Sequence, residues 1–238
     1  DVPKRLPTPA PGPAPGSVQH APVVPAASAK KAKKLSDAQL SKALLAAAEQ
    51  GAVRRLAELI ADASARGLGR EHLDAALCVA AHHDRPDAVT LLLDAGANAN
   101  ARDRYGSALA RSMWSSDDRV QDLLLARGAN PNGPSVNGAT VLHLAVARGR
   151  TSLVAKLLAA GGSTSRRDSY DHTPLHTAVT VSHPDPLPPV AILDLLLAAG
   201  GIVETKVPLL DYARANATDE HVQRVIAAQA QRKDLPPA

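Results

Sequence analysis

Large aromatic side chains are almost absent from this sequence. Phe does not occur, and Trp and Tyr together make up only 2% of the 238 residues. A conventional globule with one core usually relies on several large rings. Stacked pairs of short helices can instead fill a thin core with Leu, Val and Ala, which supply most of the 45% hydrophobic residues. The composition therefore favours many small helical units over one large core.

Cysteine and long apolar runs are also scarce. The single Cys excludes an intramolecular disulfide framework and a zinc cluster built on cysteines. No apolar run approaches the roughly 20 residues that span a bilayer. A signal or anchor upstream of residue 1 would place the protein in the periplasm, on the envelope or outside the cell, and without one we expect a cytoplasmic protein. The Ala-rich body uses more Arg than Lys, which indicates a GC-rich genome and favours a bacterial source.

Positive charge is concentrated at the start of the chain. Residues 1–34 carry a net charge of +5, whereas the whole chain carries +4, so the net charge of the remaining residues is −1. No nucleic-acid-binding body is therefore expected. This segment holds eight of the 19 prolines and ends in Lys30-Lys31-Ala32-Lys33-Lys34. It has too little apolar surface to fold, and we expect a disordered linker. A docking peptide, or weak contact of Lys30–Lys34 with an anionic surface, is an alternative role.

One phrase recurs at a fixed distance in the rest of the chain. Thr173-Pro174-Leu175-His176 follows Thr140-Val141-Leu142-His143 by 33 residues. A Leu-Leu-x-x-Gly ending recurs at Gly96, Gly128, Gly161 and Gly200, at distances of 32, 33 and 39. The one missing residue is placed most simply after Gly106, and the six extra residues lie within the Pro-rich stretch Ser182–Pro189. In this period and in these motifs, the chain resembles the ankyrin-repeat family over roughly residues 38–231.

The resemblance implies an all-α solenoid of stacked helix pairs joined by outward hairpin loops. We expect about four repeats plus degenerate N- and C-terminal caps over residues 35–233, with a disordered tail at 234–238. Ser36-Asp37 should cap the first helix and Pro86 should open the second helix of its repeat. Val222, Val225 and Ile226 indicate a last helix that becomes polar towards Lys233.

Members of the family bind other proteins through their loop tips and the concave surface of the first helices. The resemblance therefore implies a protein partner, no catalysis and no cofactor, and we expect a monomer. Trp114, Tyr105 and Tyr170 all fall on this surface, which is notable in a chain with so few rings. The implied partner-binding residues are His82, His83, Arg104, Tyr105, Trp114, Ser115, Val136, Asn137, Arg148, Arg167, Ser169, Tyr170, Thr180 and Val181.

Each of these residues also has a purely structural interpretation. Trp114 could pack against the neighbouring repeat, and the tyrosines could cover turn backbone. In the family, the histidine at the position of His143 and His176 hydrogen-bonds the turn backbone and ties adjacent repeats. Cys78 replaces that histidine in another repeat, where we expect a buried, inert thiol.

Little in the sequence supports catalysis. Consecutive residues such as His82 and His83 point about 100° apart on a helix and cannot easily share a metal. The chain has no phosphate loop, no His-Glu-x-x-His helix and no Gly-x-Ser-x-Gly elbow. The first hypothesis is therefore a non-enzymatic adaptor, inhibitor or immunity-type partner. The alternatives are a structural spacer on an envelope-anchored or secreted protein, with residues 1–34 as its stalk, and an enzyme using His82, His83 and the loop Pro184–Pro189.

Overall fold

The computed structural model describes residues 35–115, 117–133, 135, 138–179, 189–201 and 209–233. The expected linker at 1–34, most of the Pro-rich loop and the tail at 234–238 lie outside the described residues. Within that part of the chain, no helix has both the length and the apolar character needed to cross a bilayer.

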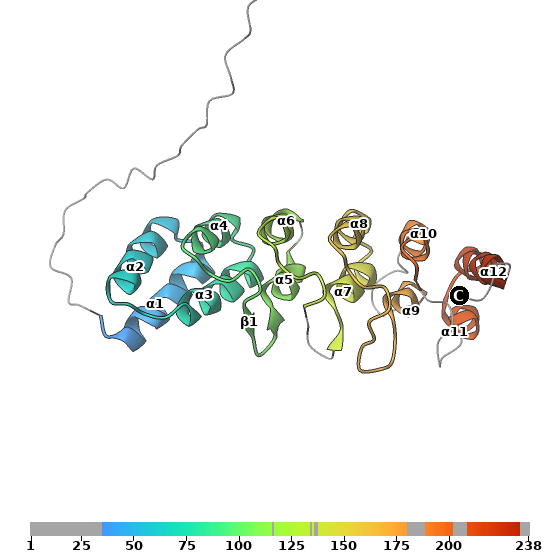
Figure 1. Ribbon diagram of the computed structural model, residues 1–238, viewed down its shortest axis with the longest axis horizontal. Coiled ribbons are helices and arrows are strands. Elements are labelled where there is room, and N and C mark those ends of the chain that lie inside the picture. The colour runs from blue at the N-terminus through green and yellow to red at the C-terminus, as the bar shows by residue number, and fades with distance from the viewer. Residues whose placement is uncertain are drawn as a thin grey trace, which may run out of the picture. The chain divides into compact units, whose positions relative to one another are not determined.

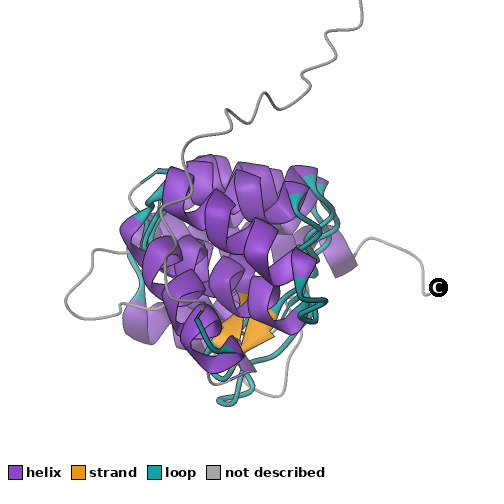
Figure 2. Ribbon diagram, turned by 90° about the vertical axis from the view of Figure 1, so that its left-hand side faces the viewer, coloured by secondary structure: helices purple, strands orange, loops and turns teal. Residues whose placement is uncertain are grey.

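The body is a row of helix pairs (Figure 1). In the part of the chain that the structure describes, six first helices form one layer and six second helices form another. Figure 2 shows the row end-on, with the helices in the middle and loops at its sides. A two-stranded antiparallel hairpin, β1 (Arg102–Asp103) and β2 (Gly106–Ser107), projects from the row. The pairs are α1 (Asp37–Gln50) with α2 (Val53–Ala65), α3 (Glu71–His82) with α4 (Pro86–Asp94), α5 (Ala108–Arg111) and the 3-10 helix η1 (Ser112–Trp114) with α6 (Arg119–Ala126), α7 (Val141–Ala147) with α8 (Thr151–Ala159), α9 (Pro174–Ala178) with α10 (Val190–Ala198), and α11 (Leu209–Asn216) with α12 (Asp219–Lys233).

Helix starts follow the predicted caps. Ser36 and Gln39 form a capping box at α1, and Pro86 is the first residue of α4. Thr140 with His143, and Thr173 with His176, form the same box at α7 and α9. In the repeat that lacks one residue, Ser107 follows Gly106 directly, and its side chain accepts a hydrogen bond from Ala110 N–H at 3.2 Å. The missing residue therefore lies where the sequence placed it.

The glycines of the repeated ending occupy equivalent places. Each follows a second helix by two residues and has a left-handed backbone, with φ of 95°, 80°, 87° and 82° at Gly96, Gly128, Gly161 and Gly200. A Cβ atom at any of the four would meet no neighbour within 4 Å. Glycine is therefore favoured here by backbone conformation and not by close packing.

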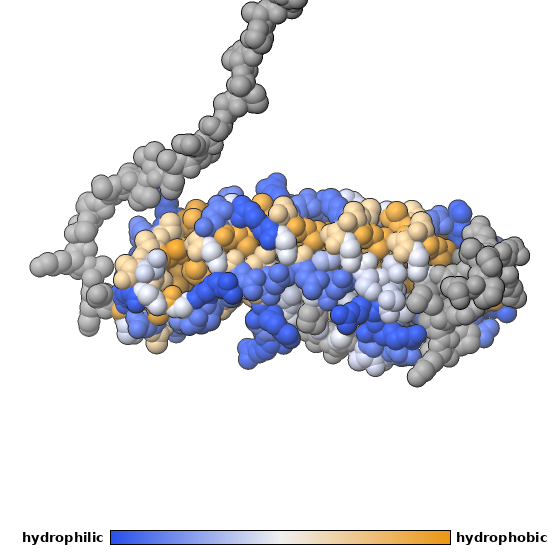
Figure 3. All heavy atoms as spheres, viewed as in Figure 1, coloured by the Kyte–Doolittle hydropathy of each residue, from blue (hydrophilic) through white to orange (hydrophobic). Residues whose placement is uncertain are grey.

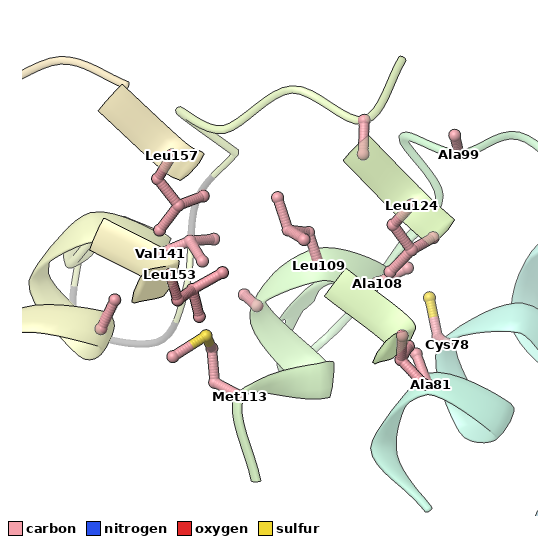
Figure 4. Packing of buried hydrophobic residues seen from close by; sticks show 14 of the residues in the cluster. Cys78, Ala81, Ala99, Ala108, Leu109, Met113, Leu124, Val141, Leu153 and Leu157 are labelled. Atoms are coloured by element: carbon pink, nitrogen blue, oxygen red, sulfur yellow. The ribbon is translucent and has the colours of Figure 1, made fainter. Parts of the chain in front are cut away.

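Small aliphatic side chains fill the space between neighbouring pairs. Figure 4 shows Cys78 of α3, Leu109 of α5, Leu124 of α6 and Leu153 of α8 within one continuous cluster, with no ring among the residues that it labels. Met113 joins the same cluster from η1. Each fully buried leucine contributes roughly 1.5–3 kcal/mol, and much of this contact is made with the next repeat. The stack consequently needs no aromatic core, as the composition predicted.

Two asparagines tie successive repeat endings together. Asn100 donates its side-chain amide to Gly128 O at 3.2 Å, and its side-chain oxygen accepts from Asn130 N–H at 2.6 Å. Asn132 repeats this pattern one unit later, with Gly161 O at 2.9 Å and Ser163 N–H at 2.7 Å. All four bonds cross from one repeat to the next. At the following equivalent position the chain has Ser165, whose side chain meets Ser163 of its own turn at 3.1 Å.

An ion-pair network links α6 to α8. Arg150 donates to the backbone carbonyls of Ser115 at 3.1 Å and Asp117 at 2.6 Å, and its guanidinium also contacts the Asp118 carboxylate. Lys156 lies 3.3 Å from Asp118 and 2.7 Å from Asp122. Burial alone would raise the pKa of Asp118, but the hydrogen bond from Arg150 and the neighbouring positive charges outweigh it and lower that pKa.

The imidazole of His143 is fixed in one tautomer by its neighbours. Its Nδ1 lies 3.1 Å from Thr140 N–H and 2.9 Å from Thr140 Oγ1, and its Nε2 lies 3.1 Å from His172 O. A backbone N–H can only donate, so Nδ1 must be unprotonated and Nε2 donates across to the next turn. Burial lowers the pKa of His143, as do the charges of His172 and His176, while its bond to His172 O and the charge of Asp168 raise it.

We predict that Asn132→Ala lowers the free energy of unfolding by about 1–3 kcal/mol, because two hydrogen bonds between repeats are lost. Ser165→Ala is the matched control at the same position of the next repeat, and it should change stability by less than about 0.5 kcal/mol. Chemical denaturation of both variants would measure the difference. Equal destabilisation by the two substitutions would contradict a special role for the asparagine.

We also predict that His143 makes the stack sensitive to acid. The folded pKa lies below the ordinary value of 6.5, so the stabilisation is complete above pH 6.5 and is lost as the pH falls below it. His143→Gln keeps a side-chain acceptor for the backbone N–H of the cap residue. Gln39 accepts in this way at the start of α1, where its Oε1 lies 2.9 Å from Ser36 N.

The comparison is made by denaturant unfolding between pH 8 and pH 5. The wild type should lose more stability than His143→Gln as the pH falls below 6.5. The difference between them should be at most about 1.4 kcal/mol per pH unit. Identical pH dependence of the wild type and the variant would show that His143 is not the group responsible.

Candidate functional site

The 3-10 turn after α5 places Trp114 on the surface. The α-helix lasts only from Ala108 to Arg111, and Ser112 Oγ then donates to Leu109 O at 2.8 Å while Ser112 O accepts from the buried Gln121 Nε2 at 2.6 Å. The tighter turn buries Met113 and leaves Trp114 69% exposed. The ring is therefore not part of the core between repeats.

Arg148 of the next repeat stacks on Trp114. Its guanidinium carbon lies 4.5 Å from the ring centroid, within the range of a cation–π interaction. Arg148 follows α7 directly, so the pair joins the ends of two neighbouring first helices. This contact holds both side chains in place while most of the ring stays accessible.

Tyr105 is held in a similar way at the hairpin tip. Its backbone N–H donates to Asp103 Oδ1 at 2.8 Å, which fixes the turn, and its ring is 45% exposed. The guanidinium carbons of Arg104 and Arg111 lie 4.7 and 4.8 Å from the ring centroid. Arg111 also pairs with Asp103, with 3.3 Å between Nε and Oδ2.

These side chains surround one hollow of about 280 Å³. Ala110 of α5 and Leu144 of α7 provide its apolar part. Among the described residues, two arginines contribute to the lining and no carboxylate does. The described lining is Tyr105, Ala110, Arg111, Trp114, Ser135, Leu144 and Arg148.

A second exposed tyrosine lies at a later tip. Tyr170 N–H donates to Asp168 Oδ1 at 2.9 Å, which repeats the Asp-x-Tyr turn of Asp103 and Tyr105. Its ring is 71% exposed and lies 6.2 Å from the His172 ring. Ser169 and Arg167 are exposed on the same tip, and Arg167 pairs with Asp171 at 2.9 Å. In Figure 3 hydrophilic residues cover the projecting β1–β2 hairpin, whereas hydrophobic residues are visible along the second helices.

One of the predicted exposed residues is not exposed. Ser115 is buried, because its side chain donates to Asp117 O at 3.0 Å and its own carbonyl accepts from Arg150. It supports the loop before α6, and the expectation that Ser115 is exposed was wrong. Val136, Asn137, Thr180 and Val181 lie outside the described residues.

His82 and His83 are near neighbours but do not form a metal site. Their ring centroids are 4.9 Å apart with the planes 76° from parallel, and His83 Nε2 lies 3.8 Å from a Glu49 oxygen. Burial and then the positive charge of Arg111 lower the pKa of His82. Among the residues described, no group of three His, Cys, Asp or Glu side chains could hold a metal ion.

The remaining reactive side chains have structural environments. Cys78 is buried, and burial, with the Asp103 charge, raises the pKa of its thiol to about 12. His176 is buried at the start of α9, as His143 is at the start of α7. The same arrangement recurs at Thr218 and His221, with 2.7 Å between the hydroxyl and Nδ1, and sequence reasoning missed this copy.

Sequence reasoning also missed Arg111 and Leu144. Arg111 and Leu144 each lie four residues after a cap, Ser107 and Thr140 respectively, so repeat alignment places them on the same helix face. Arg111 precedes Trp114 by three residues, a spacing that puts two side chains on one side of a helix. These two signals were sufficient to find Arg111. Ser135 reaches the hollow through an isolated bridge to Gly106, which repeat alignment does not reveal.

Comparison with protein families agrees with this architecture. The family described as "Ankyrin repeats (3 copies)" matches residues 109–205, and "Ankyrin repeat" matches residues 72–104. A search of curated proteins finds no significant match to the chain. The two family matches cover more than half of the chain, and the helix pairs and left-handed glycines recur in register with them. The chain therefore belongs to the ankyrin-repeat family.

Proposed function

We propose that this chain is a non-enzymatic module that binds a partner protein, as an adaptor, inhibitor or immunity-type protein. Ankyrin repeats generally mediate protein–protein interactions, which supports the coarse function. The single observation that carries the finer proposal is the exposure of three rings, Tyr105, Trp114 and Tyr170, in a chain that has only four.

The proposed contact surface consists of the hairpin tips and the ends of the first helices. Trp114 and Tyr105 form its centre, and Tyr170 lies at a later tip. Large rings that lose little conformational entropy on binding commonly dominate interface energies. Stacked arginines hold Trp114 and Tyr105 before any partner arrives, so little side-chain ordering would be required.

This surface also argues against a pure spacer. A spacer needs only a stable stack, and leaving Trp114 69% exposed contributes little to that stability. A polar side chain at residue 114 would serve a spacer equally well. The exposed rings therefore favour a binding module over the structural alternative.

We predict that Trp114→Ala and Tyr105→Ala each weaken partner binding by about 30-fold or more, the effect of a binding hot spot. Val53→Ala is the matched control, because Val53 is an exposed apolar residue on α2, a second helix away from this surface. The partner would be captured with the wild-type protein from cells that produce it. Its affinity for each variant would then be measured by titration calorimetry.

Thermal unfolding provides the second measurement. Val53→Ala should change the free energy of unfolding by no more than about 0.5 kcal/mol, and the two aromatic substitutions, which also remove arginine–ring contacts, by about 1 kcal/mol each. Wild-type affinity in both aromatic variants would overturn the assignment of this surface. Equal weakening by Val53→Ala would show that the effect is not specific to it.

A further inference from the structure

The hollow between Tyr105 and Trp114 combines apolar walls with two guanidinium groups. Arg111 and Arg148 come from neighbouring repeats, and each stacks on one of the two rings. Ala110 and Leu144 contribute apolar surface between them. The site can therefore satisfy a negative charge and an apolar group that lie close together.

The guanidinium geometry favours a planar anion. A guanidinium carries five N–H donors in its plane, so one stacked on a ring can still direct donors sideways to an acceptor. Carboxylates accept such donors in pairs, with charge-assisted bonds stronger than neutral ones. Asp103 already lies 3.3 Å from Arg111 Nε as an ion pair without a hydrogen bond, so Arg111 is suited to contribute charge more than directed donors.

The size of the hollow selects a side chain over a cofactor. Its volume is about 280 Å³. Pockets that enclose drug-sized ligands usually measure about 300–1,000 Å³ and bury most of the ligand. This hollow is at the lower limit and open beside two exposed rings, which suits one or two side chains of a larger partner.

The surrounding charges do not suit a long polyanion. Residues 35–238 carry a net charge of about −1, and the tips that bear Tyr105 and Tyr170 also bear Asp103, Asp168 and Asp171. Binding of nucleic acid generally needs a continuous basic surface that neutralises many phosphates. A single carboxylate between Arg111 and Arg148 requires only the local charge.

Building on the proposed function, we infer that this hollow binds a protein segment in which an Asp or Glu carboxylate lies beside an aliphatic or aromatic side chain. The carboxylate accepts hydrogen bonds from Arg148, with Arg111 contributing charge. The apolar side chain enters between the two rings, against Leu144. Trp114, Tyr105 and the two arginines thus define the partner's chemistry as well as the position of contact.

The test is selection from a displayed library of random dodecapeptides on the whole chain, with counter-selection on Trp114→Ala. The enriched peptides should contain an acidic residue within a few positions of a large apolar one. Trp114 is the only Trp in the chain, so its fluorescence reports binding of the synthesised peptides directly at the site.

Substitutions on both sides then test the contact. Replacing the peptide's acid by its amide should weaken binding about tenfold or more, as should Arg148→Gln, and the two losses should not add. Arg148→Lys should recover only part of the affinity, because it keeps the charge but not the planar donors. Arg127→Gln removes the same charge from the end of α6, where Arg127 pairs with Asp94 at 2.9 Å, and should leave affinity unchanged.

Three results would overturn the inference, and they separate it from the function on which it rests. Peptides that need Trp114 but carry no acid, or that keep their affinity in Arg148→Gln, would refute the partner chemistry and leave the binding surface intact. Equal competition by a 12-nucleotide RNA would indicate a polyanion ligand instead. No Trp114-dependent peptide at all would count against both the surface and its partner.

Discussion

Each helix pair of this protein exposes more apolar surface than it can cover alone, and this constraint governs the structure. Leu109 of α5 and Leu153 of α8 belong to one cluster because neighbouring pairs supply the missing cover. The asparagine bonds from Asn100 to Gly128 and from Asn132 to Gly161 fix the same neighbours at their outer ends. Packing and hydrogen bonding thus set one spacing, which allows small side chains to fill the core.

A core of Leu, Val and Ala leaves the aromatic residues free for the surface. In a single-core globule, burial of a tryptophan usually serves stability. Here Met113 and its aliphatic neighbours already fill the space beside η1, and Trp114 lies outside them. The arginine that stacks on it belongs to the next repeat, so the geometry of the hollow depends on the spacing between repeats. Stability and the proposed recognition are therefore coupled through that spacing and not through shared side chains.

Much of the fold could be predicted from local patterns. The four equivalent glycines, the cap at Ser36 and the turn at Gly106 depend on backbone preferences within a few residues. Burial of Cys78 followed from its place in the repeated phrase. The site was harder to predict, because Trp114 and Ser115 are adjacent and repeat alignment predicts that both are exposed. The 3-10 turn at Ser112–Trp114 gives the two residues opposite environments, and the bond from Gln121 to Ser112 that accompanies it comes from another helix.

The residues missed at the hollow illustrate a more general limit. Arg111 and Leu144 come from two repeats, and they meet only because those repeats are displaced by a particular amount. Repeat alignment predicts that equivalent positions have equivalent environments. A specific binding site requires the environments at equivalent positions to differ, so alignment alone cannot locate it. The hollow lies between the next repeat and the one that lacks a residue after Gly106, whose first α-helix, α5, ends at Arg111 before its 3-10 turn. In this chain the departures from regularity, which weaken prediction by repeat alignment, coincide with the surface proposed to bind a partner.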